Sequence, residues 1–167
     1  LDDPFCPVQT ECVQVMTAAA NALAAAGAQV SFTARPEGGT QFFERSHKAY
    51  LELLRESLDP SLGEKGYSKA QWDRLQIQRQ RVKATWGDFF EQGGWDVLLC
   101  PVAPFVAFEH DHASARDWQS HKKPIRVNGE PTPYFDQTKW LGLFVLSDMP
   151  STVVPVGRVD GLPCGMQ

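Results

Sequence analysis

The sequence has few cysteines, a small net charge and no long apolar run. None of its four cysteines (Cys6, Cys12, Cys100 and Cys164) forms a C-x-x-C pair, and no Cys/His pair has the short spacing of a structural zinc site. We therefore expect a cytoplasmic protein with buried, reduced thiols and no disulfide framework. A formal net charge of −4 gives no electrostatic footprint for nucleic acid or an anionic membrane. No apolar run approaches the ~20 residues that span a bilayer.

The first half of the chain has the periodicity of three helices. Apolar residues recur three or four apart over 7–26, and Gly27 is a natural stop. Residues 29–34 predict a short strand, so that a helix and a strand alternate as in α/β proteins. A second helix is expected over 40–57, where a threonine can cap its start. A third follows from 68, where S-x-x-Q has capping-box spacing, to a glycine pair at 93–94.

The second half predicts strands and turns. Residues 95–100 are almost wholly apolar, as in a central strand. The Asn128-Gly129 pair predicts a hairpin, and a helix is expected over 135–146. A strand is expected over 151–156, and its consecutive valines predict that both faces of this strand are covered by other elements. An Asp-Gly turn follows, and a further strand is expected to begin only where the chain ends. The sequence contains no internal repeat and no linker, so one unit is expected over residues 1–167.

Three motifs resemble those of the amidase signature family. Residues 150–157 have the pattern P-x-x-x-x-P-x-G, residues 161–167 have G-L-P-x-G-x-Q, and residues 96–104 have D-x-L-L-x-P-x-x-P. The opening, residues 1–30, is similar to the family's mid-chain strand exit, helix and turn. Order and spacing agree over nearly all of the chain.

The resemblance implies a fragment of the amidase signature fold, a mixed β-sheet flanked by helices that is incomplete at both ends. It implies a parent enzyme that hydrolyses the C–N bond of a small-molecule amide through an acyl-serine, without a cofactor. The family's two serines and lysine have no counterpart here, because the sequence contains no Ser-Ser-Gly or Gly-Gly-Ser-Ser run. We therefore expect the catalytic half to precede Leu1 and this chain alone to be inactive.

Two other kinds of function remain open. A stand-alone binding or scaffold module could keep the fold without the catalytic half. A metal- or thiol-dependent enzyme could use His110, His112 and Cys164, since alternate residues of an extended segment point the same way. A surface loop for the histidines and a small buried residue for Cys164 explain the same residues, so we expect no metal site. Ser120 and Lys123 match S-x-x-K, but their polar surroundings favour a solvated loop.

The helix over 135–146 is the strongest candidate for contact with a substrate. Four of its residues share one face at helical spacing, and two more at its start could hold a polar group of the substrate; the six are Tyr134, Asp136, Thr138, Leu141, Gly142 and Val145. Gly142 costs roughly 1 kcal/mol against alanine in a helix interior, which a close approach by a backbone or a ligand would explain. In some amidases this helix lines the acyl side of the substrate channel. An ordinary core stripe would have the same pattern.

The predicted strands also suggest self-association. If residues 97–100 and 153–156 are interior strands of a larger sheet, this chain alone leaves strand edges and apolar faces open. Such surfaces recruit other copies of the chain.

Overall fold

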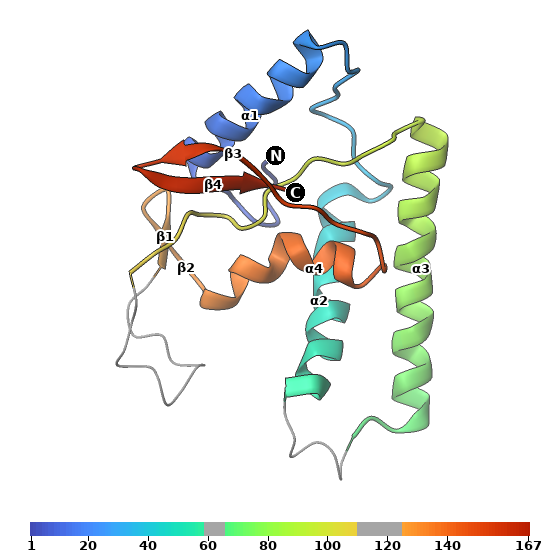
Figure 1. Cartoon of the computed structure of the whole chain (residues 1–167). Helices are drawn as coiled ribbons and strands as arrows, with labels where there is room; N and C mark the ends of the chain where they lie inside the picture. Colours follow the sequence, from blue (N-terminus) through green and yellow to red (C-terminus); the bar gives the residue numbers. More distant parts are fainter. Residues whose placement is uncertain (59–65, 110–124) are drawn as a thin grey trace. The chain divides into compact units, whose positions relative to one another are not determined.

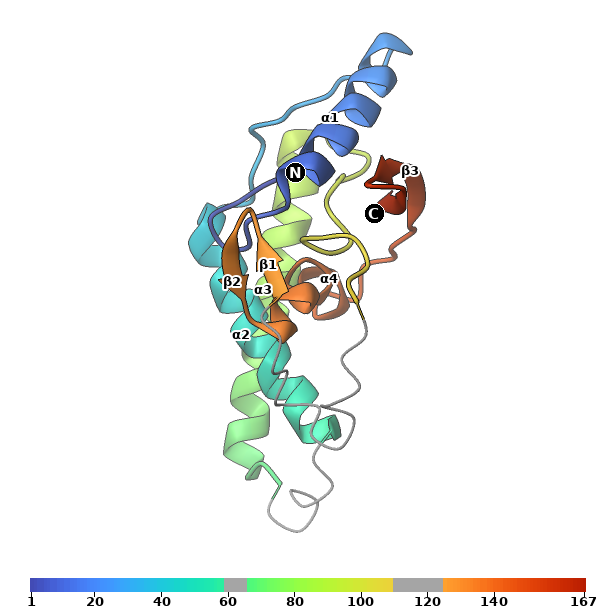
Figure 2. The same cartoon turned by 90° about the vertical axis from the view of Figure 1, so that its left-hand side faces the viewer.

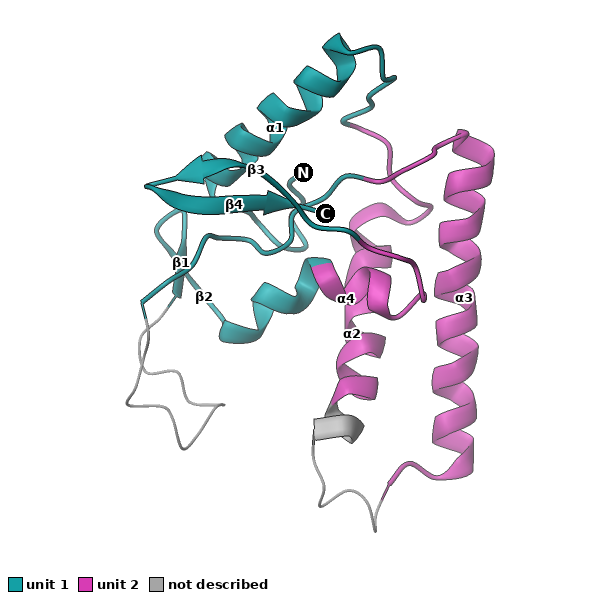
Figure 3. Cartoon of the chain, in the orientation of Figure 1, with its two compact units in different colours: residues 1–32, 99–140, 152–167 teal, residues 33–98, 141–151 magenta. Residues whose placement is uncertain are grey.

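The computed structural model describes residues 1–58, 66–109 and 125–167 (Figure 1). The elements, in order, are α1 (Thr10–Ala25), α2 (Gly39–Leu58), α3 (Lys69–Gly93), β1 (Ile125–Val127), β2 (Glu130–Thr132), the 3₁₀ helix η3 (Tyr134–Thr138), α4 (Lys139–Val145), β3 (Val154–Val159) and β4 (Leu162–Met166). Figure 3 shows two compact units. Unit 1 comprises Leu1–Phe32, Leu99–Trp140 and Thr152–Gln167, and unit 2 comprises Thr33–Leu98 and Leu141–Ser151.

The β3–β4 hairpin is the centre of unit 1. Its two strands are antiparallel and joined by Asp160 and Gly161, which both take positive φ (49° and 80°), as a tight hairpin turn requires. Helix α1 lies along this hairpin in both views (Figure 1 and Figure 2). A Cβ on Gly157 would lie 2.6 Å from Cγ1 of Val15, so the helix comes this close only because residue 157 is glycine.

The β1–β2 hairpin is tied to the start of α1. Its turn residues Asn128 and Gly129 have φ of 52° and 87°, which confirms the hairpin predicted from this pair. The Asn128 side chain accepts hydrogen bonds from the backbone N–H and hydroxyl of Thr10 (2.9 and 3.0 Å) and donates one to the carbonyl of Val8 (3.0 Å). Gln9, the residue before α1, gives no side-chain cap, so Asn128 supplies the cap from a distant part of the sequence.

Unit 2 is built on α2 and α3. The Trp86 ring lies between aromatic neighbours, with ring centroids 5.5 Å from Phe42, 6.2 Å from Phe43 and 5.7 Å from Phe144. The predicted capping box at the start of α3 is present, because Ser68 and Gln71 each bond the other's backbone N–H. Gly94 ends the helix in the left-handed conformation (φ 63°), also as predicted.

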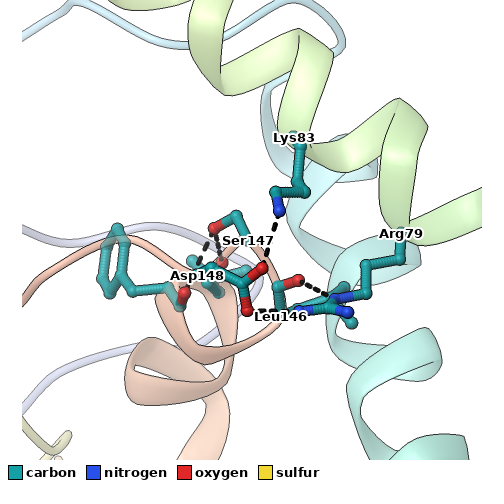
Figure 4. Close-up of polar contacts among 7 residues, drawn as sticks. Arg79, Lys83, Leu146, Ser147 and Asp148 are labelled. Atoms are coloured by element: carbon teal, nitrogen blue, oxygen red, sulfur yellow. Dashed lines mark hydrogen bonds and ion pairs between the residues drawn. The ribbon is translucent and has the colours of Figure 1, made fainter.

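A cluster of ion pairs links the loop that follows α4 to α3. Figure 4 shows Asp148 facing Arg79 and Lys83 of α3. Lys83 Nζ lies 2.6 Å from one carboxylate oxygen of Asp148, and Arg79 pairs with the other and also donates to the carbonyl of Leu146 (3.0 Å). The pKa of Asp148 is lowered below its usual range by its bonds with Lys83 and Arg79.

Several predicted elements differ from the structure. Residues 29–34 and 95–100 belong to no assigned strand. The second stretch is followed by a single antiparallel bridge between Pro101 and Met166 of β4, which is too short to form a strand. The second terminal strand is already complete as Leu162–Met166 rather than starting at the chain end. The predicted helix over 135–146 is divided into η3 and α4.

The predicted cover of the terminal strand on both faces is wrong for the described residues. Val153 and Val154 are 56% and 45% exposed, because a two-stranded hairpin that packs on one helix has an open second face. The α/β fold class is confirmed by helices that accompany small antiparallel sheets. No helix within the described ranges has both the length and the apolar character needed to cross a membrane.

Candidate functional site

Unit 1 contains a cavity of about 370 Å³. Cys12 and Met16 of α1 form one side of it, and residues from the segment 102–107 form another. The hairpin region completes the wall, with Cys164 and Gly165 among its residues. None of the lining residues is charged, and the volume lies within the range of small-molecule sites. The cavity therefore suits an apolar group of a small ligand.

Backbone hydrogen bonds between two of the sequence motifs build this wall. The backbone N–H of Cys100 donates to the carbonyl of Gln167, and the N–H of Gln167 donates back to Cys100 (both 2.9 Å). The Gln167 side chain adds a bond to the carbonyl of Pro101 (2.9 Å). On the other side, Pro104 accepts a bond from the N–H of Gln9 (2.7 Å), just before α1. The D-x-L-L-x-P-x-x-P and G-L-P-x-G-x-Q motifs are thus neighbours in space.

Gly165 lies close to two valines of the cavity wall. A Cβ at this position would lie 3.2 Å from Cγ1 of Val153 and 3.5 Å from Cγ2 of Val102. The glycine of the motif therefore lets two valines from different segments approach β4, and a larger residue would push them apart.

Two thiols lie on the cavity wall. Cys12 and Cys164 are only 2% and 5% exposed, and the Cys12 thiol donates to Oε1 of Gln9 (3.7 Å). Burial raises the pKa of Cys12 to about 12, and the neighbouring Cys164 sulfur is the second cause of this shift. The Cys12 thiol is therefore protonated at neutral pH and is a poor nucleophile.

The polar residues predicted to bind substrate at the start of the helix have partners in their own segment. Asp136 pairs with Lys139 (Oδ2 to Nζ, 2.8 Å), and the Thr138 hydroxyl donates to the carbonyl of Phe135 (2.7 Å). The Tyr134 ring meets the edge of Phe135 at 5.5 Å between centroids. All three residues are half-buried and none of them lines the cavity of unit 1.

The apolar residues predicted to bind substrate lie on α4. Leu141 and Val145 are 38% and 54% exposed, which leaves one apolar strip of the helix open. Gly142 is buried, and a Cβ there would lie 2.6 Å from Cδ1 of Tyr50. The close approach that we expected at Gly142 exists, but it comes from an aromatic side chain of α2, which explains the glycine without a ligand. Substrate binding by these residues stays a prediction.

The remaining candidates lie mostly outside the described residues. These are the histidines at 110 and 112 and the Ser120–Lys123 pair. Cys164 is described and buried, and its thiol neighbour is Cys12. Within 1–58, 66–109 and 125–167, no three His, Cys, Asp or Glu side chains gather as metal ligands.

Sequence reasoning missed the cavity. It identified both motifs that form the wall, but motif spacing along the chain does not reveal which segments meet in space. The only local signal was the proline-rich segment 101–104, since each proline fixes its own φ and restricts the residue before it.

The comparisons with known proteins agree on one family. A family model described as Amidase matches residues 3–167. One curated relative is a glutamyl-tRNA(Gln) amidotransferase subunit from a Nitratiruptor species. It is 30% identical over 102 residues, which are 61% of this chain and 19% of that protein.

Two solved structures share the fold. A bacterial aryl acylamidase of the amidase signature family matches with a TM-score of 0.63 and 23% identity over 96% of this chain. A structure described as an amidase matches with a TM-score of 0.60 and 18% identity over 95%. The chain spans 36% and 37% of the length of these two structures. The chain belongs to the amidase family.

Proposed function

We propose that this chain serves an amidase that hydrolyses a carboxamide C–N bond through an acyl-serine, and that it supplies one wall of the substrate channel. Its own contribution is the cavity of unit 1, which receives the apolar acyl or aryl group of the amide. The residues that form and cleave the acyl-serine bond are not among those of this sequence, which has no Ser-Ser-Gly run.

One observation carries this proposal. Two motifs of the amidase family lie far apart in the sequence, and they are hydrogen-bonded to each other beside an apolar cavity of small-molecule size. An apolar group of a ligand that enters this open cavity would lose contact with water there, which supports the cavity as the site that receives it.

The open strip of α4 in unit 2 is a separate candidate for contact with an apolar group. Leu141 and Val145 lie one helical turn apart and are both exposed, so they can cover an apolar group. We keep two sets of predicted substrate contacts, one in each unit. They are Tyr134, Asp136 and Thr138 in unit 1, and Leu141, Gly142 and Val145 in unit 2. The buried free cysteines favour a cytoplasmic enzyme.

Binding of a fluorinated anilide tests the cavity. We expect ¹⁹F NMR of 4-fluoroacetanilide to show saturable line broadening with the wild-type chain. Ala103→Phe, which places a ring at the cavity wall, should abolish it, whereas the same change at the exposed Ala28 should not. Broadening that Ala103→Phe leaves unchanged would show that the ligand binds elsewhere, and no broadening with any variant would contradict the proposal.

Turnover by the chain alone tests the assignment of the chemistry. We expect no hydrolysis of a panel of primary and aryl amides, because the serine–lysine machinery is absent from the sequence. Turnover that survives thiol alkylation and metal chelation, and that disappears in Ser120→Ala, would show that the S-x-x-K pair is catalytic. Turnover lost on alkylation would instead favour the thiol-dependent alternative.

A further inference from the structure

Cys12 and Cys164 line the cavity of unit 1, whereas the other two cysteines do not. After burial, the Cys164 sulfur is the next cause that raises the pKa of Cys12. The Cys12 thiol donates to Oε1 of Gln9 (3.7 Å). Cys6 instead donates to the carbonyl of Asp136 (3.7 Å), and Cys100 donates to the carbonyl of Pro101 (3.5 Å). All four cysteines are free thiols, and Cys12 and Cys164 are the two whose described contacts include a second thiol.

The packing of α1 on the β3–β4 hairpin brings the segments of the two residues together. In the β3–β4 register, Cys164 is the direct partner of Gly157. Val15 of α1 packs on Gly157, where an added Cβ would lie 2.6 Å from its Cγ1. Cys12 lies three residues before Val15 and therefore one turn away on the same face of α1. Cys12 therefore lies one helical turn from the contact with Gly157, the strand partner of Cys164, and both cysteines line the cavity.

We propose that Cys12 and Cys164 form a reversible disulfide site that connects α1 to β4 across the cavity wall. The oxidant is a low-molecular-weight disulfide that enters the cavity. This assigns a modification site, and it does not depend on the amidase proposal.

The exchange proceeds in two balanced steps. The thiolate of one cysteine attacks a sulfur of R–S–S–R, the S–S bond breaks, and the released R–S⁻ takes up the proton that the cysteine lost. The thiolate of the second cysteine then attacks the cysteine sulfur of this mixed disulfide, and the second R–S⁻ leaves and is protonated in turn. The two cysteines lose two electrons, which reduce R–S–S–R to two R–SH.

The apolar surroundings favour a disulfide over a bound metal. A soft metal held by two thiolates would carry charge into a wall on which no lining residue is charged, whereas a disulfide is neutral. The same burial that keeps the Cys12 thiol protonated makes the first step slow, and the proximity of the second thiol makes the second step fast.

Two matched double variants of the full chain test the proposal. Cys6→Ser/Cys100→Ser retains only the proposed pair, and Cys12→Ser/Cys164→Ser retains only the other two cysteines. Each is treated with 2-hydroxyethyl disulfide, quenched with N-ethylmaleimide and weighed intact by mass spectrometry. We expect the first variant to form an intramolecular disulfide faster than the second by on the order of tenfold or more, and a thiol reductant to reverse it. In strong urea the difference between the variants should vanish.

Three outcomes would overturn the proposal. One is equal disulfide yield from both variants under native conditions. A second is a stable mixed disulfide on Cys12 or Cys164 that the other thiol fails to displace. The third is a crosslink between separate chains only, seen as a covalent dimer at low protein concentration. The alanine double variants, Cys6→Ala/Cys100→Ala and Cys12→Ala/Cys164→Ala, repeat the comparison if a buried serine prevents folding.

Discussion

The cap that Asn128 gives to α1 can be tested by one substitution series. Asn128→Ala removes three hydrogen bonds, two from Thr10 and one to Val8. It also places alanine at φ 52°, a left-handed conformation that asparagine tolerates better. Two further variants separate these effects. Asn128→Gly removes the bonds without the left-handed strain, and Asn128→Asp keeps the acceptor but loses the donor.

The expected losses follow from the contacts. Loss of a helix N-cap costs about 1 kcal/mol, and each further hydrogen bond contributes about 1 kcal/mol net at such partly exposed positions. Left-handed alanine adds about 1 kcal/mol. We therefore expect the free energy of unfolding to fall by about 4 kcal/mol in Asn128→Ala, by about 3 kcal/mol in Asn128→Gly and by about 1 kcal/mol in Asn128→Asp. These are large fractions of the roughly 5–15 kcal/mol that typically stabilises a domain.

Urea unfolding followed by circular dichroism at low protein concentration measures the series. Asn21→Ala is the matched control, because Asn21 lies exposed within α1 and alanine there should leave stability unchanged or raise it slightly. An Asn128→Ala midpoint equal to that of wild type would refute the capping role. A loss in Asn128→Asp as large as that in Asn128→Ala would show that the acceptor oxygen is not what stabilises α1.

Three further predictions concern unit 2 and the open hairpin. Gly142→Ala should lower the free energy of unfolding by about 1–3 kcal/mol, because its Cβ would lie 2.6 Å from the Tyr50 ring. The loss should be smaller in a Tyr50→Leu background, and equal losses in both backgrounds would contradict this explanation. The hydrogen bonds of Asp148 with Lys83 and then Arg79 lower its pKa in the folded state. Its carboxylate therefore stabilises the fold fully at a pH above the unfolded-state pKa of about 3.9. This contribution is lost as the pH falls through the folded-state pKa. The difference in midpoint between wild type and Asp148→Asn should therefore shrink in acid, and a difference that is independent of pH would contradict the ion pairs. The exposed valines at 153 and 154 should promote self-association, which light scattering with size exclusion measures over a concentration series; a monomer at every concentration would contradict it.

Local chemistry predicted the turns and helix ends well. Ser68 and Gly94 bound α3 as their residue types suggest, and the Asn128-Gly129 and Asp160-Gly161 pairs both form hairpin turns. In each case a few neighbouring residues fix the backbone, so a short stretch of sequence carries the information. Residues 29–34 show the limit of this reasoning, because a strand needs a partner that local propensity does not supply.

Contacts between distant residues could not be predicted. The glycine at 142 was recognised as unusual, but the Tyr50 ring that requires it belongs to a different helix. The pairing of Cys12 with Cys164 depends on how closely α1 approaches β3, which in turn depends on Gly157. For the same reason the cavity was missed, although both motifs that form its wall were identified from the sequence. Each of these features needs the packed structure.

The backbone resonances of the chain in the presence of an aryl amide test the central claim most directly. In a ¹⁵N-labelled sample titrated with 4-fluoroacetanilide, the proposed function predicts saturable shift changes at the cavity wall, in residues 102–107 and at Gly165. Ala103→Phe should remove those changes. Saturable changes that spare the whole wall, or no changes at all up to the solubility limit of the ligand, would contradict the assignment of this cavity to the substrate of an amidase.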